Sequence, residues 1–290
     1  MTRPTVVSLP PRSPTGSSPL IASPGPPGRR PFRSAVPFYV AGRLDYPSDL
    51  IADVAAALQL GPLELGRPAR VLDLGCGPGF LALGFAALDC AVVAMDPEPE
   101  MLDAARRAAD AAGADIEFVA GGSEDLSPTL GRFDLVTMGR SFHWMDREKT
   151  LVALDALVEP KGGIALFRDG HPECPENDWH EAWRQVRRRY VAKTRHLAPP
   201  RVDPDSGHED VLERSAFSDL ERLKQRYRRR TSVAQIVDRA LSMSSCSPER
   251  LGADRACFEA ELRAALAPYA SDGMIEETVE AEALLARRPG

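Results

Sequence analysis

The sequence predicts a doubly wound α/β sheet followed by a largely helical region, and three observations lead to this fold class. First, short apolar runs alternate with helical patterns, with brief connections, from residue 46 to residue 169. Second, these runs are nearly continuous in apolar character, as in parallel strands that are covered on both faces. Third, the alternation stops after residue 170, where helical spacing dominates.

The elements of the first part follow in order along the chain. Residues 46–61 predict a helix that Ser48 caps and Gly61 ends. A second amphipathic helix is expected to have Pro97 in its first turn and to close at Gly113. Further helices are predicted at 79–89 and 146–163, and strands at 69–75, 91–96, 115–120, 133–138 and 163–169.

The second part contains a helical pattern at residues 176–193, with Trp179, Trp183 and Tyr190 at helical spacing. A lid over a substrate pocket and ordinary core packing explain these aromatic residues equally well. More helices are predicted at 208–221, 232–245 and 255–270, and a closing strand at 275–289.

Composition divides the chain into three parts. Residues 1–34 hold five arginines and no acidic residue and are rich in Pro, Ser and Gly, so we expect a disordered tail. We expect residues 35–170 to form a ligand-binding core, and residues 171–290 to form a lid or substrate region with a part that completes the sheet. The net charge of −6 argues against nucleic acid as the main partner. No apolar run approaches the roughly 20 residues of a membrane helix.

The five cysteines are scattered, which suggests reduced thiols and a cytoplasmic protein. His171, Cys174 and His180 could be considered as metal ligands, but their spacing matches no standard zinc site. We therefore predict no metal centre.

The segment VLDLGCGPG at residues 71–79 is the strongest functional signal. Gly75, Gly77 and Gly79 follow an apolar strand, but Phe80 stands where the dinucleotide fingerprint needs its third glycine. Asp73 would also repel a pyrophosphate, whereas it would attract a ligand with ammonium and sulfonium groups. The segment therefore favours a cationic, phosphate-free nucleoside such as S-adenosylmethionine.

Asp96 ends the next predicted strand, 21 residues after Gly75. Because parallel strands end at the same edge of the sheet, both residues should lie at the ligand crevice. The two carboxylate oxygens of Asp96 can accept hydrogen bonds from both ribose hydroxyls. The alternative role for Asp96 is an acid at the start of the following helix.

Four segments in the right order resemble motifs I, post-I, II and IV of class I S-adenosylmethionine-dependent methyltransferases: VLDLGCGPG, VVAMDPEPEML, GGSEDL and FDLVTMGRSFHWMD. The likeness is closest to the broad small-molecule, type 11-like branch, and it covers residues 38 to about 168. It implies a Rossmann-like, mostly parallel sheet of seven strands and S-adenosylmethionine as cofactor.

The resemblance also implies cofactor contacts. The segment around Tyr39 and Arg43 resembles one that folds over the cofactor, where an arginine suits its carboxylate. The loop after the fourth strand, with Gly139 and Arg140, would pass the methionine part. The remaining implied cofactor-binding residues come from motifs I, post-I and II: Asp73, Gly75, Cys76, Gly77, Gly79, Asp96, Pro97, Met101, Ser123, Glu124 and Asp125.

His143, in the FHW sequence, is the best candidate catalytic base, because it follows the fourth strand and its imidazole suits proton abstraction. A structural role that shapes the pocket explains it as well. Trp144 is interpreted as a large packing aromatic or as a neighbour of the ligand. His171, close behind the fifth strand, is a second candidate base.

The basic runs at residues 187–190 and 224–230 contain aromatics, which is typical of RNA-binding surfaces. Solvated charged faces explain them better in a chain of acidic total charge.

We therefore expect an enzyme that moves a methyl group from S-adenosylmethionine to an O, N or C atom of a small organic molecule by in-line displacement. Two alternatives remain open at this stage. One is an RNA or protein methyltransferase that uses the Arg-rich runs, and the other is a protein that binds the cofactor without methylating.

Overall fold

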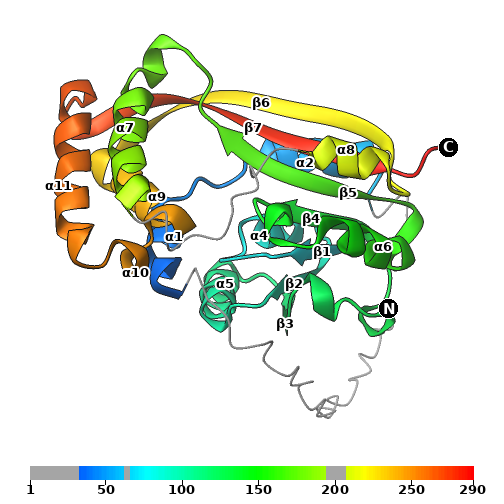
Figure 1. The fold of residues 1–290 in the computed structure, drawn as a ribbon. Coiled ribbons are helices and arrows are strands. Elements are labelled where there is room, and N and C mark those ends of the chain that lie inside the picture. Colours follow the sequence, from blue (N-terminus) through cyan, green and yellow to red (C-terminus); the bar gives the residue numbers. More distant parts are fainter. Residues whose placement is uncertain (1–32, 62–65, 194–206) are drawn as a thin grey trace, which may run out of the picture.

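The computed structural model describes residues 33–61, 66–193 and 207–290, so the expected tail at 1–34 lies almost wholly outside the described residues. A seven-stranded sheet forms its centre, in the order β3-β2-β1-β4-β5-β7-β6 (Figure 1). The strands are β1 Arg70–Leu74, β2 Ala91–Asp96, β3 Ile116–Ala120, β4 Phe133–Gly139, β5 Val158–Gly170, β6 Asp219–Ser232 and β7 Met274–Arg287.

Strands β1 to β5 run parallel, whereas β7 pairs antiparallel with β5 and β6 pairs antiparallel with β7. This arrangement confirms the predicted doubly wound, mostly parallel sheet. The strand order reverses at β1, which has β2 on one side and β4 on the other. Ligands of such sheets bind beyond the carboxyl ends of the strands at this reversal.

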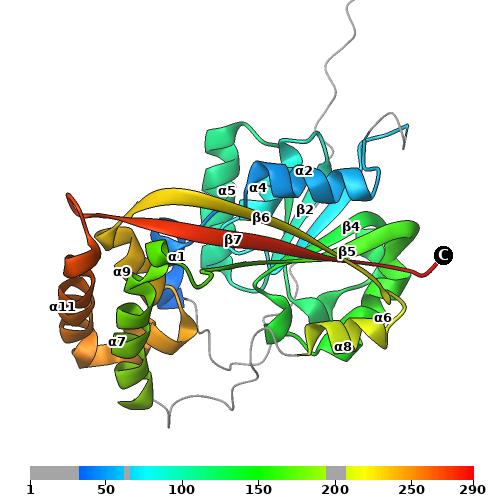
Figure 2. The same ribbon diagram turned by 90° about the horizontal axis from the view of Figure 1, so that it is seen from above.

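Two helical layers cover the sheet, with α2, α4 and α5 on one face and α6 and α8 on the other (Figure 2). A third group gathers around the ends of β5, β6 and β7 that extend past the other strands (Figure 1). The helices are α1 Val36–Gly42, α2 Ser48–Ala57, α4 Phe80–Ala86, α5 Pro99–Ala112, α6 Arg147–Leu157, α7 Trp179–Lys193, α8 His208–Glu213, α9 Val233–Leu241, α10 Pro248–Leu251 and α11 Arg255–Leu266.

Several helix ends differ from the prediction. Ser48 is the first residue of α2 and makes no capping hydrogen bond, and the helix ends at Ala57 rather than near Gly61. Helix α5 begins at Pro99, so Pro97 lies outside its first turn. Pro99 is the first residue of α5, where its missing N–H costs nothing and its fixed φ favours the helix. Pro47 stands directly before α2 as its N-cap residue.

The largest difference lies in residues 208–221, which were expected to be helical. Helix α8 stops at Glu213, and β6 begins at Asp219 and pairs with β7 along its whole length. The outward positions of β6 are charged, so the strand lacks an apolar run. β5 also begins earlier than the predicted strand 163–169. Its first residue, Val158, lies inside the expected helix 146–163 and pairs with Phe133 of β4. The closing strand is confirmed as β7.

Three hydrophobic clusters hold these layers together. One joins the sheet to α2 and α4, a second joins it to α6 and α8, and a third lies among α7, α9 and α11. Trp179, Trp183 and Tyr190 are buried in the third cluster. Their position agrees with core packing rather than with a lid face that lines a pocket.

Candidate functional site

The glycine loop begins where β1 ends. Gly75, Gly77 and Gly79 have φ values of 72°, 53° and 91°, in the left-handed region that favours glycine. The N–H groups of Gly75 and Cys76 both donate to the Met95 carbonyl of β2, at 2.7 and 3.0 Å. These two bonds fix the turn against the neighbouring strand.

The backbone of this loop is open on one side and closely packed on the other. A Cβ atom at Gly77 would meet only the Tyr39 ring, at 3.9 Å, so a ligand can approach the backbone there. A Cβ atom at Gly75 would lie 2.5 Å from the Cβ of Ser141. Only glycine therefore allows the loop after β4 to pass this point.

Asp73 lies beneath the loop, on β1, and is 1% exposed. Its carboxylate accepts hydrogen bonds from the Ala82 N–H at 3.0 Å and from the Thr137 hydroxyl at 3.2 Å. Burial raises the pKa of Asp73 to about 7, and the two hydrogen bonds offset only part of that effect. A cation bound beside this carboxyl would stabilise its ionised form.

Asp96 ends β2 and is buried. Its two oxygens accept hydrogen bonds from the N–H groups of Gly77, at 2.8 Å, and Glu98, at 2.9 Å. Burial raises its pKa, while the same two bonds work in the opposite direction. Asp96 thus ties the glycine loop to the start of α5, and each oxygen keeps a further lone pair for a ligand.

The residues expected near an adenine lie around these strand ends. Pro97 is exposed, and Met101 is buried against Val36. A 3-10 turn after β3 contains Ser123, Glu124 and Asp125. Just before this turn, the Gly121 N–H donates to the Asp96 carbonyl of β2 at 3.2 Å. Cys76 is buried, and burial raises the pKa of its thiol.

A cavity of about 480 Å³ opens beyond the ends of β4 and β5. Of the predicted site residues, Tyr39, Arg43 and His143 line it, and Gly139 stands directly between two lining residues. The glycine loop, Asp73, Asp96 and the Ser123–Asp125 turn do not line it. The site therefore has two parts. One is the glycine loop with Asp73 and Asp96 at the ends of β1 and β2, where a sheet of this order is expected to have its ligand crevice. The other is the cavity beyond β4 and β5.

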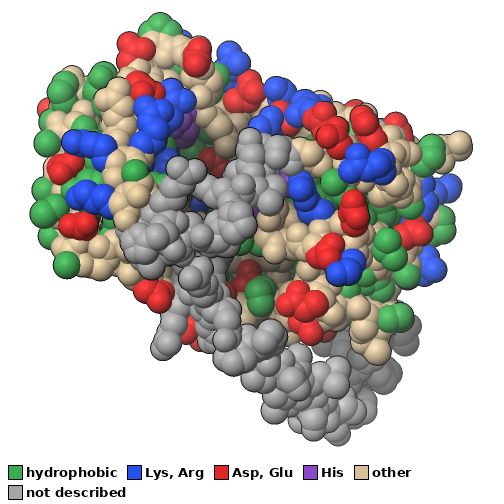
Figure 3. Space-filling model, in the orientation of Figure 1, with side chains coloured by type: hydrophobic (Ala, Val, Ile, Leu, Met, Phe, Trp, Pro, Cys, Tyr) green, Lys and Arg blue, Asp and Glu red, His purple; other side chains and the backbone are tan. Residues whose placement is uncertain are grey.

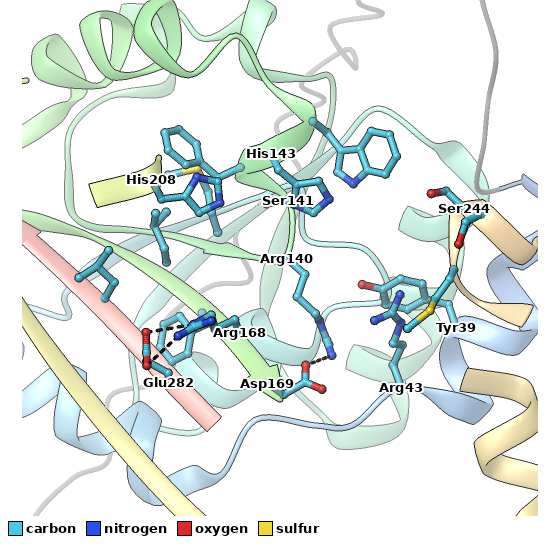
Figure 4. Close-up of a pocket in the computed structure, with 18 of the residues that line it drawn as sticks. Tyr39, Arg43, Arg140, Ser141, His143, Arg168, Asp169, His208, Ser244 and Glu282 are labelled. Atoms are coloured by element: carbon cyan, nitrogen blue, oxygen red, sulfur yellow. Dashed lines mark hydrogen bonds and ion pairs between the residues drawn. The ribbon is translucent and has the colours of Figure 1, made fainter. Parts of the chain in front are cut away.

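Arg140 is the central cation of this cavity. It reaches across to Asp169, with Tyr39 and Arg43 on one side and His208 and Arg168 on the other (Figure 4). Burial works against its charge, but the neighbouring Asp169 outweighs this and raises the pKa of Arg140. The Arg140 guanidinium also lies over the ring of Tyr46, at 4.9 Å from its centroid.

Charged side chains from three neighbouring strands, β5, β6 and β7, also line the cavity. Arg168 of β5 pairs with Glu282 of β7 at 3.0 Å (Figure 4). Arg222 of β6 pairs with the same carboxylate. Glu282 is buried and its pKa is lowered, because these cations outweigh the effect of burial.

His143 lies in a 3-10 turn, Phe142–Trp144, directly after β4. Its ring is 5.1 Å from that of Trp144, which lines the same cavity and is 49% exposed. His171, the second candidate base, is not among the cavity-lining residues. Its Nε2 lies 2.7 Å from the buried Glu277 carboxylate.

Sequence reasoning missed His208, Asp169, Glu282 and Ser242. The Arg147 guanidinium, which can only donate, lies 3.1 Å from Nδ1 of His208. His208 of α8, Asp169 of β5 and Glu282 of β7 line the cavity, whereas Ser242, after α9, is buried behind Arg43 and accepts a hydrogen bond from it. The sequence did contain a signal for β6 and β7. Basic residues alternate along β6 and acidic residues alternate along β7, as expected for two strands that pair through their charges.

The basic run at 224–230 faces an acidic partner strand. Lys224 and Arg226 pair with Glu280, and Arg228 pairs with Glu176. Basic and acidic side chains lie next to each other along the upper edge of the molecule in Figure 3. This pairing agrees with the solvated-face interpretation rather than with an RNA surface.

Within the described ranges, no group of three or more His, Cys, Asp or Glu side chains is placed to hold a metal ion. None of the helices in the described part of the chain combines the length and apolar character that a bilayer span requires.

Comparison with known families places the motifs in context. Residues 71–162 match a family described as a methyltransferase domain. An uncharacterized methyltransferase of Mycobacterium tuberculosis is 29% identical over 187 residues, which are 58% of this chain and 72% of the relative. A malonyl-[acyl-carrier protein] O-methyltransferase of Pseudescherichia vulneris is 34% identical over 133 residues, 46% of this chain and 51% of that protein.

The fold also occurs in solved structures. A putative type II methyltransferase from Anaeromyxobacter dehalogenans has a TM-score of 0.57 and 22% identity, covering 85% of this chain and 97% of that one. A putative methyltransferase from Bacillus halodurans has a TM-score of 0.51 and 22% identity, covering 84% and 100%.

The sheet, the glycine loop and these similarities agree with one another: residues 71–162 match a methyltransferase domain, and the chain is a methyltransferase that uses S-adenosylmethionine as its methyl donor. The four segments that predicted this class, motifs I, post-I, II and IV, all lie within the matched residues 71–162.

Proposed function

We propose that this enzyme methylates a small polar molecule held in the cavity between β4, β5 and the helices beyond them, with an oxygen atom as the acceptor. The main support for this function is the cavity of about 480 Å³, which suits a small ligand and is lined by charged and aromatic side chains. Two proteins that are similar to this chain, a malonyl-[acyl-carrier protein] O-methyltransferase and a ubiquinone biosynthesis O-methyltransferase, support oxygen as the acceptor.

We assign the crevice at the ends of β1 and β2 to the cofactor. The open backbone at Gly77 fits a ligand that approaches closely, and Asp96 lies where it can accept from a ribose. Asp73 favours the positive methionine end. The other proposed contacts follow the resemblance: Tyr39, Arg43, Gly75, Cys76, Gly79, Pro97, Met101, Ser123, Glu124, Asp125 and Gly139.

Bound S-adenosylmethionine supplies a methyl group already activated on a sulfonium. The chain then needs chiefly to orient the acceptor in line and to exclude water. His143 is the proposed base that takes a hydroxyl proton on an imidazole nitrogen as the oxygen attacks. If the acceptor oxygen is already a carboxylate, His143 instead shapes the cavity.

We also propose that two of the parts of the chain that composition distinguished have different roles. Residues 35–170 bind the cofactor, residues 171–290 complete the substrate cavity, and the protein works in the cytoplasm. Arg187, His208 and Ser244, which line the cavity and come from the second part of the chain, support this division.

The test is formation of S-adenosylhomocysteine from S-adenosylmethionine with a panel of hydroxylated and carboxylated small molecules. His143→Gln should lower kcat at least 100-fold with a hydroxyl acceptor and leave S-adenosylhomocysteine affinity within twofold. A change in KM alone would assign His143 to shaping the cavity. Tight binding of a nicotinamide nucleotide with no binding of S-adenosylhomocysteine would overturn the proposal.

A further inference from the structure

Ser242, at the end of α9, holds the side chain of Arg43, 199 residues earlier. The Arg43 Nε–H donates to the Ser242 hydroxyl oxygen at 2.8 Å. The same hydroxyl donates its own proton to the Arg239 carbonyl at 2.7 Å. Ser242 is 0% exposed, so water does not compete for this hydroxyl.

Arg239, one helical turn earlier, holds the backbone of the same segment. Its Nε–H donates to the Gly42 carbonyl at 3.3 Å, while its two terminal nitrogens pair with Glu277 at 2.8 and 2.9 Å. Glu277 is 0% exposed, and Arg239 and His171 lower its pKa despite its burial. Separating this pair is unfavourable, because it would leave each charge buried without its partner.

Helices α1 and α9 are also in close backbone contact. A Cβ atom on Gly42 would lie 2.2 Å from the backbone nitrogen of Arg239. The last turn of α1 therefore packs directly against the backbone of α9. Tyr39 lies in this turn and Arg43 follows it, so the packing also locates these two residues. The Arg43 guanidinium lies 5.0 Å from the centroid of the Tyr39 ring.

We propose that Ser242, together with the Arg239–Glu277 pair, positions Arg43 for the cofactor before the cofactor arrives. The inference rests on the proposed function, in which Arg43 receives the methionine carboxylate. An arginine side chain carries substantial rotamer entropy, and a ligand that must immobilise it loses affinity. Holding the guanidinium at Ser242 removes that cost from binding.

A purely structural role for Ser242 predicts a different outcome from a positioning role. If the hydroxyl acts only on the fold, its removal weakens cofactor binding equally whether or not Arg43 is present. If it acts through Arg43, its removal has no effect once Arg43 is gone. A double-mutant cycle on binding separates the two.

The experiment measures the Kd of S-adenosylhomocysteine by calorimetry for the wild type, Arg43→Gln, Ser242→Ala and the double variant. We expect Ser242→Ala to weaken binding about tenfold and Arg43→Gln about 30-fold or more. The double variant should match Arg43→Gln within twofold. Circular dichroism and Tm establish that each variant is folded at the temperature of the titration.

Ser247→Ala is the matched control, since it removes a buried hydroxyl from the same stretch and keeps the Arg43–Ser242 bond. Its Kd should stay within twofold of the wild type. Multiplicative losses in the double variant, or an equal loss in the control, would overturn the inference and leave the proposed function standing. Failure of the wild type to bind would instead overturn the proposed function itself.

Discussion

The two sides of the proposed cofactor site are constructed in different ways. The crevice at β1 and β2 is held by hydrogen bonds that backbone N–H groups of the glycine loop donate to β2. The Gly75 N–H donates to the Met95 carbonyl and the Gly77 N–H to the Asp96 carboxylate, 20 and 19 positions later in the chain. The opposite side is held by side chains that join α1 to α9 across 197 and 199 positions. The first kind leaves a recognisable motif, whereas the second depends on the complete fold.

The largest effect should come from the crevice, on Asp96→Ala. The substitution removes the proposed ribose acceptor and leaves the N–H groups of Gly77 and Glu98 without their partner. Charge-assisted bonds contribute roughly 1.5–3 kcal/mol each, so the Kd of S-adenosylhomocysteine should rise about 100-fold in calorimetry. Asp110→Ala, at an exposed position of α5, is the control. A rise below threefold would show that the crevice does not carry the affinity.

Gly42→Ala should have the next largest effect and tests the opposite side. Its Cβ would lie 2.2 Å from a backbone atom of Arg239, so α1 must move away from α9. Overpacking of this kind costs about 1–3 kcal/mol, and we expect a lower Tm with about tenfold weaker cofactor binding. Gly170→Ala, where a Cβ meets nothing within 4 Å, should change neither. Unchanged binding in Gly42→Ala would mean that α1 does not need this position.

These contrasts explain what the sequence could predict. The alternation of elements indicated the sheet, and the VLDLGCGPG segment located the crevice, because both signals are local. Whether Asp73, Asp96 and Arg43 bind the cofactor remains a prediction. Strand β6 was missed because its outward face is basic, and its stability comes from acidic partners on β7, about 55 residues later in the chain. The Ser242 and Arg239 contacts could not be predicted, since no local pattern pairs α9 with α1.

Asp73→Asn should have a moderate, pH-dependent effect. The pKa of Asp73 is about 7 in the folded protein against 3.8 in a free chain, so the folded state holds a proton that the unfolded state has lost. The free energy of unfolding of the wild type should therefore fall as the pH rises from about 4 to 7, by roughly 1 kcal/mol for each pH unit.

The asparagine variant should lack this decline, as measured by urea unfolding at pH 5 and pH 8. It should also lose more affinity for S-adenosylmethionine than for S-adenosylhomocysteine, because only the former carries the sulfonium charge. Equal pH dependence in the two proteins would place the titrating group elsewhere.

The smallest effect is expected on the outer face of β6. Arg226, Arg228 and Arg230 point outward, and the first two pair with glutamates in exposed ion pairs. Such pairs contribute about 0–1 kcal/mol, so changing all three to Gln should leave activity within twofold and Tm nearly unchanged. Salt-dependent RNA binding that the triple variant loses would favour the RNA alternative instead.

The length of β5, β6 and β7 has a mechanical consequence. Each of these strands has 13 or 14 residues and runs from the methyltransferase sheet into the helical end without interruption (Figure 1). The two ends of the molecule are therefore joined by a continuous, hydrogen-bonded ribbon rather than by a flexible tether. Residues of both ends line the cavity, so widening it by moving the two ends apart must twist or bend that ribbon. The elasticity of the sheet therefore becomes a determinant of how fast reactants enter and leave.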